Sequence, residues 1–519
     1  MKVVTVEQMR AIEQSSVEHG VSLDELQRNA AAAVSREVGR LVARGSRPLL
    51  FLVGPGNNGR DALIAAEMLM SAGWTVRAYL APKVGSEDVL GRLRDGGCEV
   101  HAHGEGDDAG LLKRWVAESI AVVDGLLGIG IRGAVREPMA GIISAAGEET
   151  SRLGIPVVAV DVPSGIDADS GAVAGVALRA DYTVSLGCVK TGLLKFPAAE
   201  YVGRLIPVEI GLPPASYAQI RVNLLSPDSA VGLIPRRPLN AHKGTFGRVL
   251  VVSGSRCFVG AAYLVGCAAA RSGCGLVTLA VPEWQRGPLA SLLPEATYLP
   301  LLDPAEEGAG EANLRAVREM LHDCSAIAVG PGLGQSPAVA RLVMGLLEAN
   351  RAEKAVPTVV DADGLNALAG EREWWTRVGE GHVLTPHPGE MSRLSGLPTA
   401  EINRDRWEVA RGAAERWGQV VVLKGAFTVI AEPGGVGWVS PFALPALASG
   451  GTGDVLTGLI AGLIAQGTRP AEAARAAVVV HALAAERWLA ENGADRMLAS
   501  DLLPHLPRVI RELEPPGRA

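Results

Sequence analysis

The sequence predicts an α/β fold that is divided into two domains. Short apolar segments suited to buried strands alternate with segments of helical periodicity along both halves of the chain. A content of 63 glycines, with 48% hydrophobic but only 4% aromatic residues, is typical of compact chains with many tight strand-to-helix turns. At 519 residues the chain is too long for one hydrophobic core, and two large domains account for its length.

The first half begins with helical periodicity over residues 3–43 and then repeats a pattern of strand, loop and helix. A glycine-rich loop at 54–61 follows the first of these strands and precedes a helix expected over 62–72. Strands are expected at residues 47–53, 75–80, 121–124, 157–160 and 182–186. Their alternation with helices predicts a parallel, doubly wound sheet, in which ligands bind at the carboxyl ends of the strands.

A stretch with Pro-Pro, Ser-Pro and Arg-Arg-Pro between residues 211 and 238 interrupts this pattern. We therefore expect a first domain at 1–215, a linker at 216–238 and a second domain at 239–519. In the second domain, helices are expected at 260–272 and 455–464, and strands at 247–254, 276–281, 326–329, 358–360, 382–385 and 420–423. The second half is thus also predicted to be α/β.

The totals exclude several classes of protein. A net charge of -7 gives no reason to expect nucleic acid as a partner. The longest apolar segments are interrupted by charged residues and are too short for a membrane span, so no membrane partner is expected. Six cysteines without a C-x-x-C pair, and an N-terminus without a signal-like segment, favour the reducing cytoplasm.

The run Gly450-Gly451-Thr452-Gly453-Asp454 is the most informative motif in the chain. Small residues at the start of a helix let backbone N–H groups approach a phosphate, and the helix dipole favours its negative charge. An acidic side chain at such a place suits a base that takes a proton from a reacting hydroxyl. A glycine-rich turn with an acidic helix start is the alternative interpretation of these five residues.

Two further loops of the second half carry polar groups. Lys-Gly-Ala-Phe-Thr at residues 424–428 follows an expected strand and offers a cation, a small turn and a hydroxyl that suit a nucleotide. His387 lies between two prolines that fix its loop, which favours contact with a ligand over a solvated loop position.

In the first half, residues 54–61 lack the lysine of a P-loop and do not fit the G-x-G-x-x-G pattern of dinucleotide sites. The oxygen groups of Asn58, Asp124 and Ser164 stand at the ends of expected strands, where they suit a hard cation or a hydrogen-bonded ligand. Asp161 lies where a buried strand meets the same edge, which suits a general base. Ordinary Asx turns and a helix cap are the alternatives for these residues.

At this point the motifs resemble a known family over nearly the whole chain. Residues 54–61 resemble the G-x-G-N-N-G-G-D-G loop of NAD(P)HX epimerases, and residues 161–171 resemble their D-V-P-S-G-x-D-x-x-x-G segment. The second half resembles ADP-dependent NAD(P)HX dehydratases, through motifs at 242–247, 271–278, 330–334, 385–390, 424–428 and 450–454. In this order, the two halves resemble the bifunctional NAD(P)H-hydrate repair enzymes.

The resemblance implies a Rossmann-like, three-layer α/β/α sandwich followed by a ribokinase-like domain. It also implies that the protein rescues nicotinamide cofactors whose ring has added water. The first domain would interconvert the R and S forms of NADHX and NADPHX. The second would consume ADP, accompanied by Mg2+, to return the S form to NADH or NADPH with release of AMP and phosphate. A homo-oligomer is expected.

Carried over by position, the resemblance assigns roles to individual residues. Asp454 and Asp161 would be the catalytic bases of the two domains, and Asn58, Asp124 and Ser164 would hold K+. The adenine nucleotide would contact Lys424, Gly425, Ala426, Phe427, Thr428 and Gly453. The hydrate would contact Asn57, Asn58, Gly59, Arg60, Asp61, Gly128, Ile129, Gly130, Ile131, Arg132, Gly133, Ala134, Asp161, Ala261, Gly332, His387 and Asp454.

The first half departs from the family pattern at a few positions. Arg60 and Ala62 stand where the pattern usually has glycine, and residues 128–133 replace a more usual G-T-G-L. An arginine at position 60 would either crowd the ligand or reach one of its phosphates. The alternative function is a ribokinase-type kinase of small molecules, with a first half that serves only for binding or oligomerisation.

Overall fold

The computed structural model describes residues 1–106, 108–493 and 495–514, so the last five residues of the predicted second domain lie outside it. The chain divides into two compact units, Met1–Leu224 and Leu225–Ala519. The division falls inside the segment 216–238 that the sequence analysis assigned to a linker. Short elements occupy this part of the chain: η2 (Pro214–Tyr217), β10 (Val222–Leu224) and α8 (Pro227–Ala230).

The first unit contains a seven-stranded sheet in the order β4-β3-β2-β5-β6-β7-β9, in which neighbouring strands are parallel. Its strands are β2 (Leu49–Val53), β3 (Val76–Leu80), β4 (Glu99–Ala102), β5 (Ala121–Gly125), β6 (Val157–Val160), β7 (Tyr182–Leu186) and β9 (Arg204–Val208). A separate pair joins β1 (Val3–Val4) to β8 (Val189–Lys190). The predicted parallel sheet is thus confirmed.

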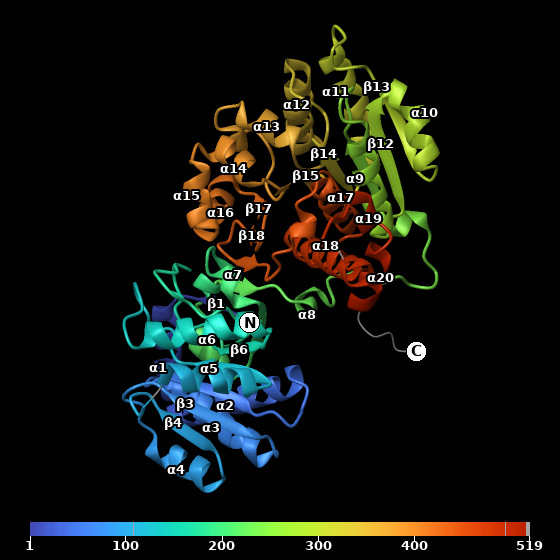
Figure 1. Cartoon of the computed structure of the whole chain (residues 1–519). Helices are drawn as coiled ribbons and strands as arrows, with labels where there is room; N and C mark the ends of the chain where they lie inside the picture. Colours follow the sequence, from blue (N-terminus) through green and yellow to red (C-terminus); the bar gives the residue numbers. More distant parts are fainter. Residues whose placement is uncertain (107, 494, 515–519) are drawn as a thin grey trace. The chain divides into compact units, whose positions relative to one another are not determined.

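Helices cover both faces of this sheet (Figure 1). On one face, buried side chains of the sheet pack with α1 (Val6–Glu18), α2 (Leu23–Leu41), α3 (Asn57–Ser71) and α4 (Glu87–Asp95). On the other face they pack with α5 (Asp108–Glu118) and α6 (Met139–Leu153). The short helices η1 (Thr191–Leu194) and α7 (Ala199–Val202) precede β9. These are the three layers of an α/β/α sandwich.

The second unit is built on the strand order β19-β18-β17-β16-β15-β14-β11-β12-β13. Its strands are β11 (Arg248–Val252), β12 (Leu276–Pro282), β13 (Thr297–Leu301), β14 (Ala326–Val329), β15 (Thr358–Val360), β16 (Val383–Leu384), β17 (Val420–Leu423), β18 (Val429–Ala431) and β19 (Gly437–Val439). The pairs from β13 to β17 are parallel, and the two pairs from β17 to β19 are antiparallel.

Helices also pack against this second sheet (Figure 1). One core joins alternate strand residues to α9 (Val259–Arg271), α10 (Glu283–Leu292), α17 (Thr452–Ala465), α18 (Pro470–Asn492), α19 (Ala499–Leu502) and α20 (Leu506–Leu513). The intervening strand residues are buried as well, as expected for a sheet covered on both sides. The remaining elements are η3 (Lys243–Phe246), α11 (Ala309–Glu319), η4 (Leu321–Asp323), α12 (Pro337–Glu353), α13 (Asp363–Ala369), η5 (Trp374–Thr376), α14 (Pro388–Ser395), α15 (Thr399–Arg404), α16 (Arg406–Trp417) and η6 (Pro445–Leu447).

Two helices begin earlier than the sequence indicated. Helix α3 begins at Asn57 instead of residue 62, because Gly56 supplies its N-cap and the polar loop forms the first turns. Helix α17 begins at Thr452 instead of residue 455, because Gly451 takes the N-cap position with φ of 92°. Residues 57–61, which were assigned to a loop, are thus the first turns of α3, whereas Asp454 lies in the first turn of α17 as expected. The free N–H groups of both helix starts favour an anion.

Helices α9 and α17 pack closely because glycines remove side chains from their contact. A Cβ added at Gly458 would lie 2.2 Å from the carbonyl oxygen of Val265, and one added at Gly462 would lie 2.0 Å from the Ser272 hydroxyl. Helix α9 carries Ala261 and helix α17 carries Asp454, so this contact fixes two predicted site residues relative to each other.

We predict that Gly458→Ala destabilises the second unit by roughly 1–3 kcal/mol, because the new methyl group overlaps backbone that cannot move away. The matched control is Gly412→Ala in α16, where a Cβ meets nothing within 4 Å and alanine favours the helix. Chemical denaturation of both variants checks this. A Gly458→Ala protein as stable as the control would contradict the packing.

Candidate active sites

The polar loops of the first unit meet at the point where its strand order reverses. Strands β2 and β5 are neighbours, and the chain leaves them in opposite directions across the sheet. The Asn58 amide donates to the carbonyl oxygen of Leu127 at 2.9 Å, and a Cβ at Gly128 would lie 3.1 Å from that of Asn58. The structure therefore joins the start of the predicted segment 128–134 to the predicted segment 57–61. Ligand sites in parallel sheets form at such a crevice.

The three side chains predicted to hold a cation form one cluster. Asp124 is fully buried and accepts hydrogen bonds from the Ser164 hydroxyl at 2.6 Å and the Ser164 N–H at 2.8 Å. The Ser164 hydroxyl oxygen in turn accepts from the N–H of Leu127, the residue whose carbonyl binds Asn58. Burial raises the pKa of Asp124, because its charge has lost the stabilisation of water.

The predicted base of the first unit is paired with a lysine that the sequence analysis missed. Lys190 Nζ donates to Asp161 Oδ1 at 2.5 Å, and the lysine side chain is only 1% exposed. The N–H of Leu186 donates to the same oxygen at 2.9 Å. Asp161 has a positive φ of 62°, a strained conformation for a residue with a side chain. The backbone thus holds this carboxylate in a fixed place at the end of β6.

Two more carboxyl groups act on this pair. Burial raises the pKa of Asp61 to about 8, and the charges of Asp161 and Glu13 add to the shift. Burial also raises the pKa of Glu13. The charge of Lys190 opposes this shift, and the charge of Asp161 adds to it. Glu13 comes from α1, far from the other groups in sequence, and no local motif indicated it.

The two residues that replace glycines of the family pattern, Arg60 and Ala62, have distinct surroundings. The Arg60 guanidinium turns toward α4, where it pairs with Asp88 at 3.4 Å and donates to the Ser86 hydroxyl at 3.2 Å. It also donates from Nε to the side-chain oxygen of Gln27 at 2.9 Å. Ala62 is fully buried and packs beside Gly125, where an added Cβ would lie 2.5 Å from its own. Arg60 therefore spans helices α2, α3 and α4.

In the second unit, the start of α17 lies beside a buried ion pair. Lys424 Nζ donates to Asp361 Oδ1 at 2.5 Å, and the Thr457 hydroxyl donates to Asp361 Oδ2 at 2.7 Å. A Cβ at Gly453 would lie 3.2 Å from Lys424 Nζ, so this glycine lets the lysine approach the helix end. The structure thus brings Lys424 and Gly453 together, as the predicted nucleotide site requires.

Asp361 is the residue of this site that the sequence analysis missed. It directly follows strand β15 and is 1% exposed. A carboxylate at the end of a buried parallel strand was the signal that identified Asp124 and Asp161, and the same signal was present here.

The charges of this cluster set the protonation of the predicted base. Burial raises the pKa of Asp454 to about 7, Asp361 adds to the shift, and Lys424 opposes it. Burial disfavours the charged form of Lys424, but Asp361 and Glu390 outweigh that cost and raise its pKa. Asp454 therefore exchanges its proton close to neutral pH, the range in which a general base works best.

The loop 424–428 is fixed by its backbone conformation and by hydrogen bonds. Gly425 and Phe427 have positive φ values of 142° and 55°, and the Phe427 side chain is buried. The Thr428 hydroxyl donates to the carbonyl oxygen of Gly425 at 2.9 Å. Behind the loop, Arg406 donates to the carbonyl oxygens of Leu423 and Lys424. These bonds point the carbonyl groups inward, while Gly425 and Ala426 are exposed.

His387 forms the N-cap of α14. Its Nδ1 accepts from the N–H groups of Gly389 and Glu390, which places the proton of the neutral ring on Nε2. Burial lowers the pKa of His387, and Lys424 adds to the effect, so the neutral form prevails at pH 7. The imidazole is half-exposed, and its Nε2 lies 3.5 Å from Glu390 Oε1.

Ala261 and Gly332 also face each other. A Cβ at Gly332 would lie 2.9 Å from that of Ala261, and one at Gly451 would lie 2.6 Å from Leu264 on the same helix α9. The predicted hydrate contacts on α9 and after β14 thus adjoin each other, and α9 also touches the glycine run that precedes Asp454.

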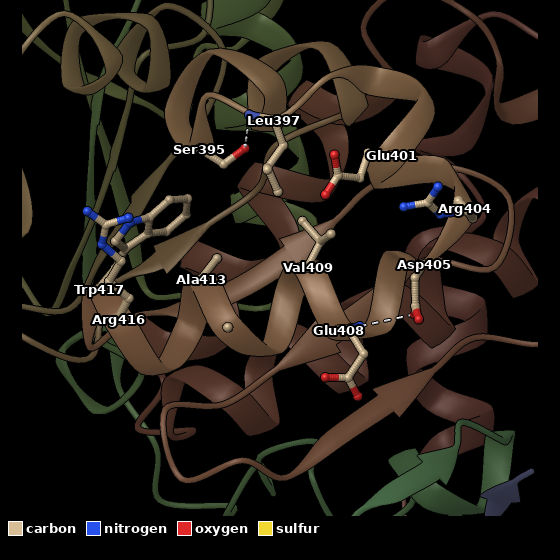
Figure 2. A pocket seen from close by; sticks show the side chains of 11 residues that line it. Ser395, Leu397, Glu401, Arg404, Asp405, Glu408, Val409, Ala413, Arg416 and Trp417 are labelled. Carbon is tan, nitrogen blue, oxygen red and sulfur yellow. Dashed lines mark hydrogen bonds between the residues drawn. The ribbon is translucent and has the colours of Figure 1, made fainter.

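A separate groove of about 410 Å³ lies at the far end of α14, against α15 and α16 (Figure 2). Charged side chains of both signs line it, including Glu401, Arg404 and Arg416. It contains none of the predicted site residues, and we assign it no role in the chemistry.

Each unit therefore places carboxyl groups, a paired lysine and a helix start at one edge of a parallel sheet. This defines the class of protein: a two-domain α/β enzyme with one acid–base site in each unit. The family model described as NAD(P)H-hydrate dehydratase matches residues 249–508. The model described as YjeF-related protein N-terminus matches residues 23–192.

Relatives resemble the chain over nearly all of its length. The bifunctional NAD(P)H-hydrate repair enzyme Nnr of Thermofilum pendens is 36% identical over 522 residues, which cover 99% of this chain and 97% of that protein. The protein of the same name from Moorella thermoacetica is 38% identical over 479 residues, covering 90% of this chain and 88% of that protein. A ribokinase-like superfamily protein of Enterococcus faecalis is 27% identical with a TM-score of 0.51, covering 57% of this chain and 97% of that one.

The chain belongs to the family of bifunctional NAD(P)H-hydrate repair enzymes. The family, fold class and enzyme class predicted from the sequence are confirmed, and the alternative of a kinase with a non-catalytic first half loses its support. All six cysteines are free. Within the described residues, no helix is long and apolar enough to cross a membrane, and no cluster of three His, Cys, Asp or Glu side chains suits a metal ion.

We predict that Asp454→Asn stabilises the protein in a pH-dependent manner. The ordinary pKa of the carboxyl is 3.8, whereas in the folded protein it is about 7. Between these values the unfolded chain loses the proton while the folded protein keeps it, so the free energy of unfolding of the wild type falls as the pH rises. The gain of the variant should grow from pH 4 to pH 7, to about 4 kcal/mol at most, and then stay constant.

Thermal unfolding of both proteins between pH 4 and pH 9 checks this expectation. Asp228→Asn is the control, because Asp228 is an exposed carboxylate at the start of α8. A gain for Asp454→Asn that is equal at all pH values, or equal to that of the control, would contradict the raised pKa.

Proposed function

We propose that this protein repairs hydrated nicotinamide cofactors in two steps, one in each unit. The first unit interconverts the R and S hydrates of NADH and NADPH. The second unit dehydrates the S form with ADP, and releases AMP and phosphate. The observation that carries the proposal is the position of Asp454, a carboxyl with a pKa of about 7 at the start of a helix and close to Lys424.

In the second unit, Asp454 takes the proton of the hydrate's hydroxyl, and that oxygen attacks the terminal phosphorus of ADP. The bond from this phosphorus to the AMP oxygen breaks, so the hydrate becomes a phosphate ester and AMP leaves. The ring nitrogen's lone pair then expels the phosphate, which is a far better leaving group than hydroxide, and a carbon–nitrogen double bond forms. The adjacent ring carbon then loses a proton to solvent, its bonding electrons form the ring double bond, and the reduced cofactor is restored. Lys424 and the N–H groups at the start of α17 neutralise the transferred phosphoryl group.

The loop 424–428 and Gly453 hold the nucleotide in this proposal. Gly425 and Ala426 are exposed and carry little or no side chain, so a nucleotide can approach the backbone of the loop there. Mg2+ bound with the nucleotide would neutralise the phosphate charge, and it usually needs only one or two protein carboxylates besides the phosphates. The carboxyl oxygens of Asp363 and Glu390, whose charges act on Asp454, fit this requirement. Ala261, Gly332 and His387 would contact the hydrate.

In the first unit, Asp161 is the proposed base, and residues 57–61 and 128–134 contact the hydrate. Asn58, Asp124 and Ser164 provide oxygen ligands, one of them a buried carboxylate that is hydrogen-bonded to the N–H groups of Ser164 and Leu126 and to the Ser164 hydroxyl. This set fits K+, which would neutralise Asp124 and fix the loops after β2 and β5. Asn58 would then hold the substrate loop through its bond to Leu127.

We predict that the protein regenerates the absorbance of NADH from S-NADHX when ADP and a magnesium salt are added. Asp454→Asn should reduce the rate by about 10²- to 10⁴-fold, the usual contribution of a general base. ADP binding, measured by calorimetry, should stay close to that of the wild type. A protein that acts only with ATP, or that leaves the hydrate unchanged, would overturn the proposal for the second unit.

We also predict that the first unit depends on K+. Replacement of K+ by Na+ should slow the conversion of R-NADHX to S-NADHX, and Asp124→Asn should remove the difference between the two ions. The two hydrates can be separated by chromatography in the absence of ADP. Equal rates in both salts would remove the cation from the proposal, and a rate equal to that of spontaneous epimerisation would remove the epimerase.

A further inference from the structure

We propose that Asp61 is a second catalytic residue of the first unit, which gives a proton to the ring nitrogen of the hydrate while Asp161 takes one from its hydroxyl. Arg60 and Gln27 are its positioning residues. This inference rests on the proposed epimerase function and assigns an acid to a reaction for which only a base has been named.

The surroundings of Asp61 leave one of its oxygens unexplained. Asp61 lies in the second turn of α3 and is 8% exposed. Its Oδ1 is buried and has no hydrogen-bond partner within the part of the chain that the structure describes. A buried polar atom without a partner is costly, and native proteins keep one where a ligand completes it. Asp61 lies one helical turn beyond Asn58, whose side chain contacts Leu127 and Gly128, and it is close enough to Asp161 to feel the charge of that residue.

The charges around Asp61 favour its protonated form. Burial raises its pKa to about 8, and the carboxylates of Asp161, after β6, and Glu13, on α1, add to the shift. Two groups act in the opposite direction: the Gln27 side chain, which hydrogen-bonds to the carboxyl, and the charge of Arg60. The buried Lys190 is paired with Asp161. At neutral pH the site therefore holds a carboxylate and a carboxylic acid, the combination that a proton exchange requires.

Arg60 fixes the orientation of the amide that touches Asp61. A guanidinium can only donate hydrogen bonds, so Gln27 must present its carbonyl oxygen to Arg60 Nε, at 2.9 Å. The NH2 group of the same amide is then the part that remains to bond to Asp61. The pairing with Asp88 anchors the other side of the guanidinium. A glycine at position 60 would leave Gln27 free to turn over.

The chemistry of the hydrate requires both groups. Its hydroxyl and its ring nitrogen share one carbon. Asp161 takes the hydroxyl proton, a carbon–oxygen double bond forms, the carbon–nitrogen bond breaks, and the nitrogen takes a proton from Asp61. The open aldehyde turns about the adjacent single bond and closes from its other face, as both protons return to their donors. The ring has then inverted at one carbon, with no net change of atoms, protons or electrons.

The test measures conversion of R-NADHX to S-NADHX without ADP, at pH 6 to 10, for the full-length protein. We expect Asp61→Asn to lower the rate of epimerisation by about 10²-fold or more, which is the usual effect of removing a general acid. The wild-type rate should fall above pH 8, where Asp61 loses its proton. For Arg60→Gly and Gln27→Leu this fall should move to higher pH, because each variant removes a group that lowers the pKa of Asp61.

Arg92→Ala is the matched control. Arg92 also contacts Asp88, because its guanidinium donates to the backbone carbonyl oxygen of Asp88 at 2.9 Å. The other partner of Arg92 is Glu67 and not Gln27. If Arg60 has only a structural role, Arg60→Gly and Arg92→Ala should have the same effect on the rate, and neither should move the pH profile. That result would overturn the positioning role. Thermal unfolding and circular dichroism of each variant report whether the first unit is folded, and ADP-dependent dehydration of S-NADHX reports the second unit alone.

The outcomes separate this inference from the function on which it rests. If the wild type does not exceed spontaneous epimerisation, the proposed function of the first unit fails. If the wild type does epimerise the hydrate and Asp61→Asn retains its full rate, the function stands and the acid role of Asp61 is wrong. Gln27→Leu decides the matter should Asp61→Asn not fold, since an unchanged pH profile in that variant would also contradict the inference.

Discussion

Both units depend on a buried ion pair between a lysine and an aspartate that follows a parallel strand. Asp161 follows β6 and binds Lys190 at 2.5 Å, while Asp361 follows β15 and binds Lys424 at the same distance. A lone carboxylate at such a place would lose the stabilisation of water and take up a proton. The lysine pairs with the carboxylate and fixes its position. The pKa values of Asp61 and Glu13 in the first unit, and of Asp454, Glu390 and His387 in the second, respond to the charges of this pair.

In each unit a second carboxyl group, beside the ion-paired aspartate, has a raised pKa. Burial and the neighbouring carboxylates raise the pKa of Asp61 to about 8 and that of Asp454 to about 7. The first unit thereby gains a group that holds a proton at neutral pH, beside one that is charged. The second gains a group that exchanges its proton easily and can act as a base. The two sites share a design, although no sequence repeat relates them.

The sequence predicts the parts of this design that are local. Glycine-rich helix starts, strand-end carboxylates and the parallel sheets follow from residues that are neighbours in the chain, and Asn58, Asp161 and Asp454 were found in that way. Lys190 and Glu13 could not be found, because their effect arises only when the fold brings a two-residue strand and an N-terminal helix to the same place. Asp361 could have been found from its position after a strand. The orientation of Arg60 depends on α2 and α4, so its role was beyond any local pattern.

The glycines between α9 and α17 have a consequence for the thermodynamics of ligand binding. Because Gly458 and Gly462 leave no side chain between the two helices, α9 and α17 are fixed in relation to each other before any ligand arrives. Ala261 and Asp454, on opposite sides of that contact, are therefore already in place. A ligand that settles between them pays little conformational entropy to order the protein, and more of its contact energy remains as affinity.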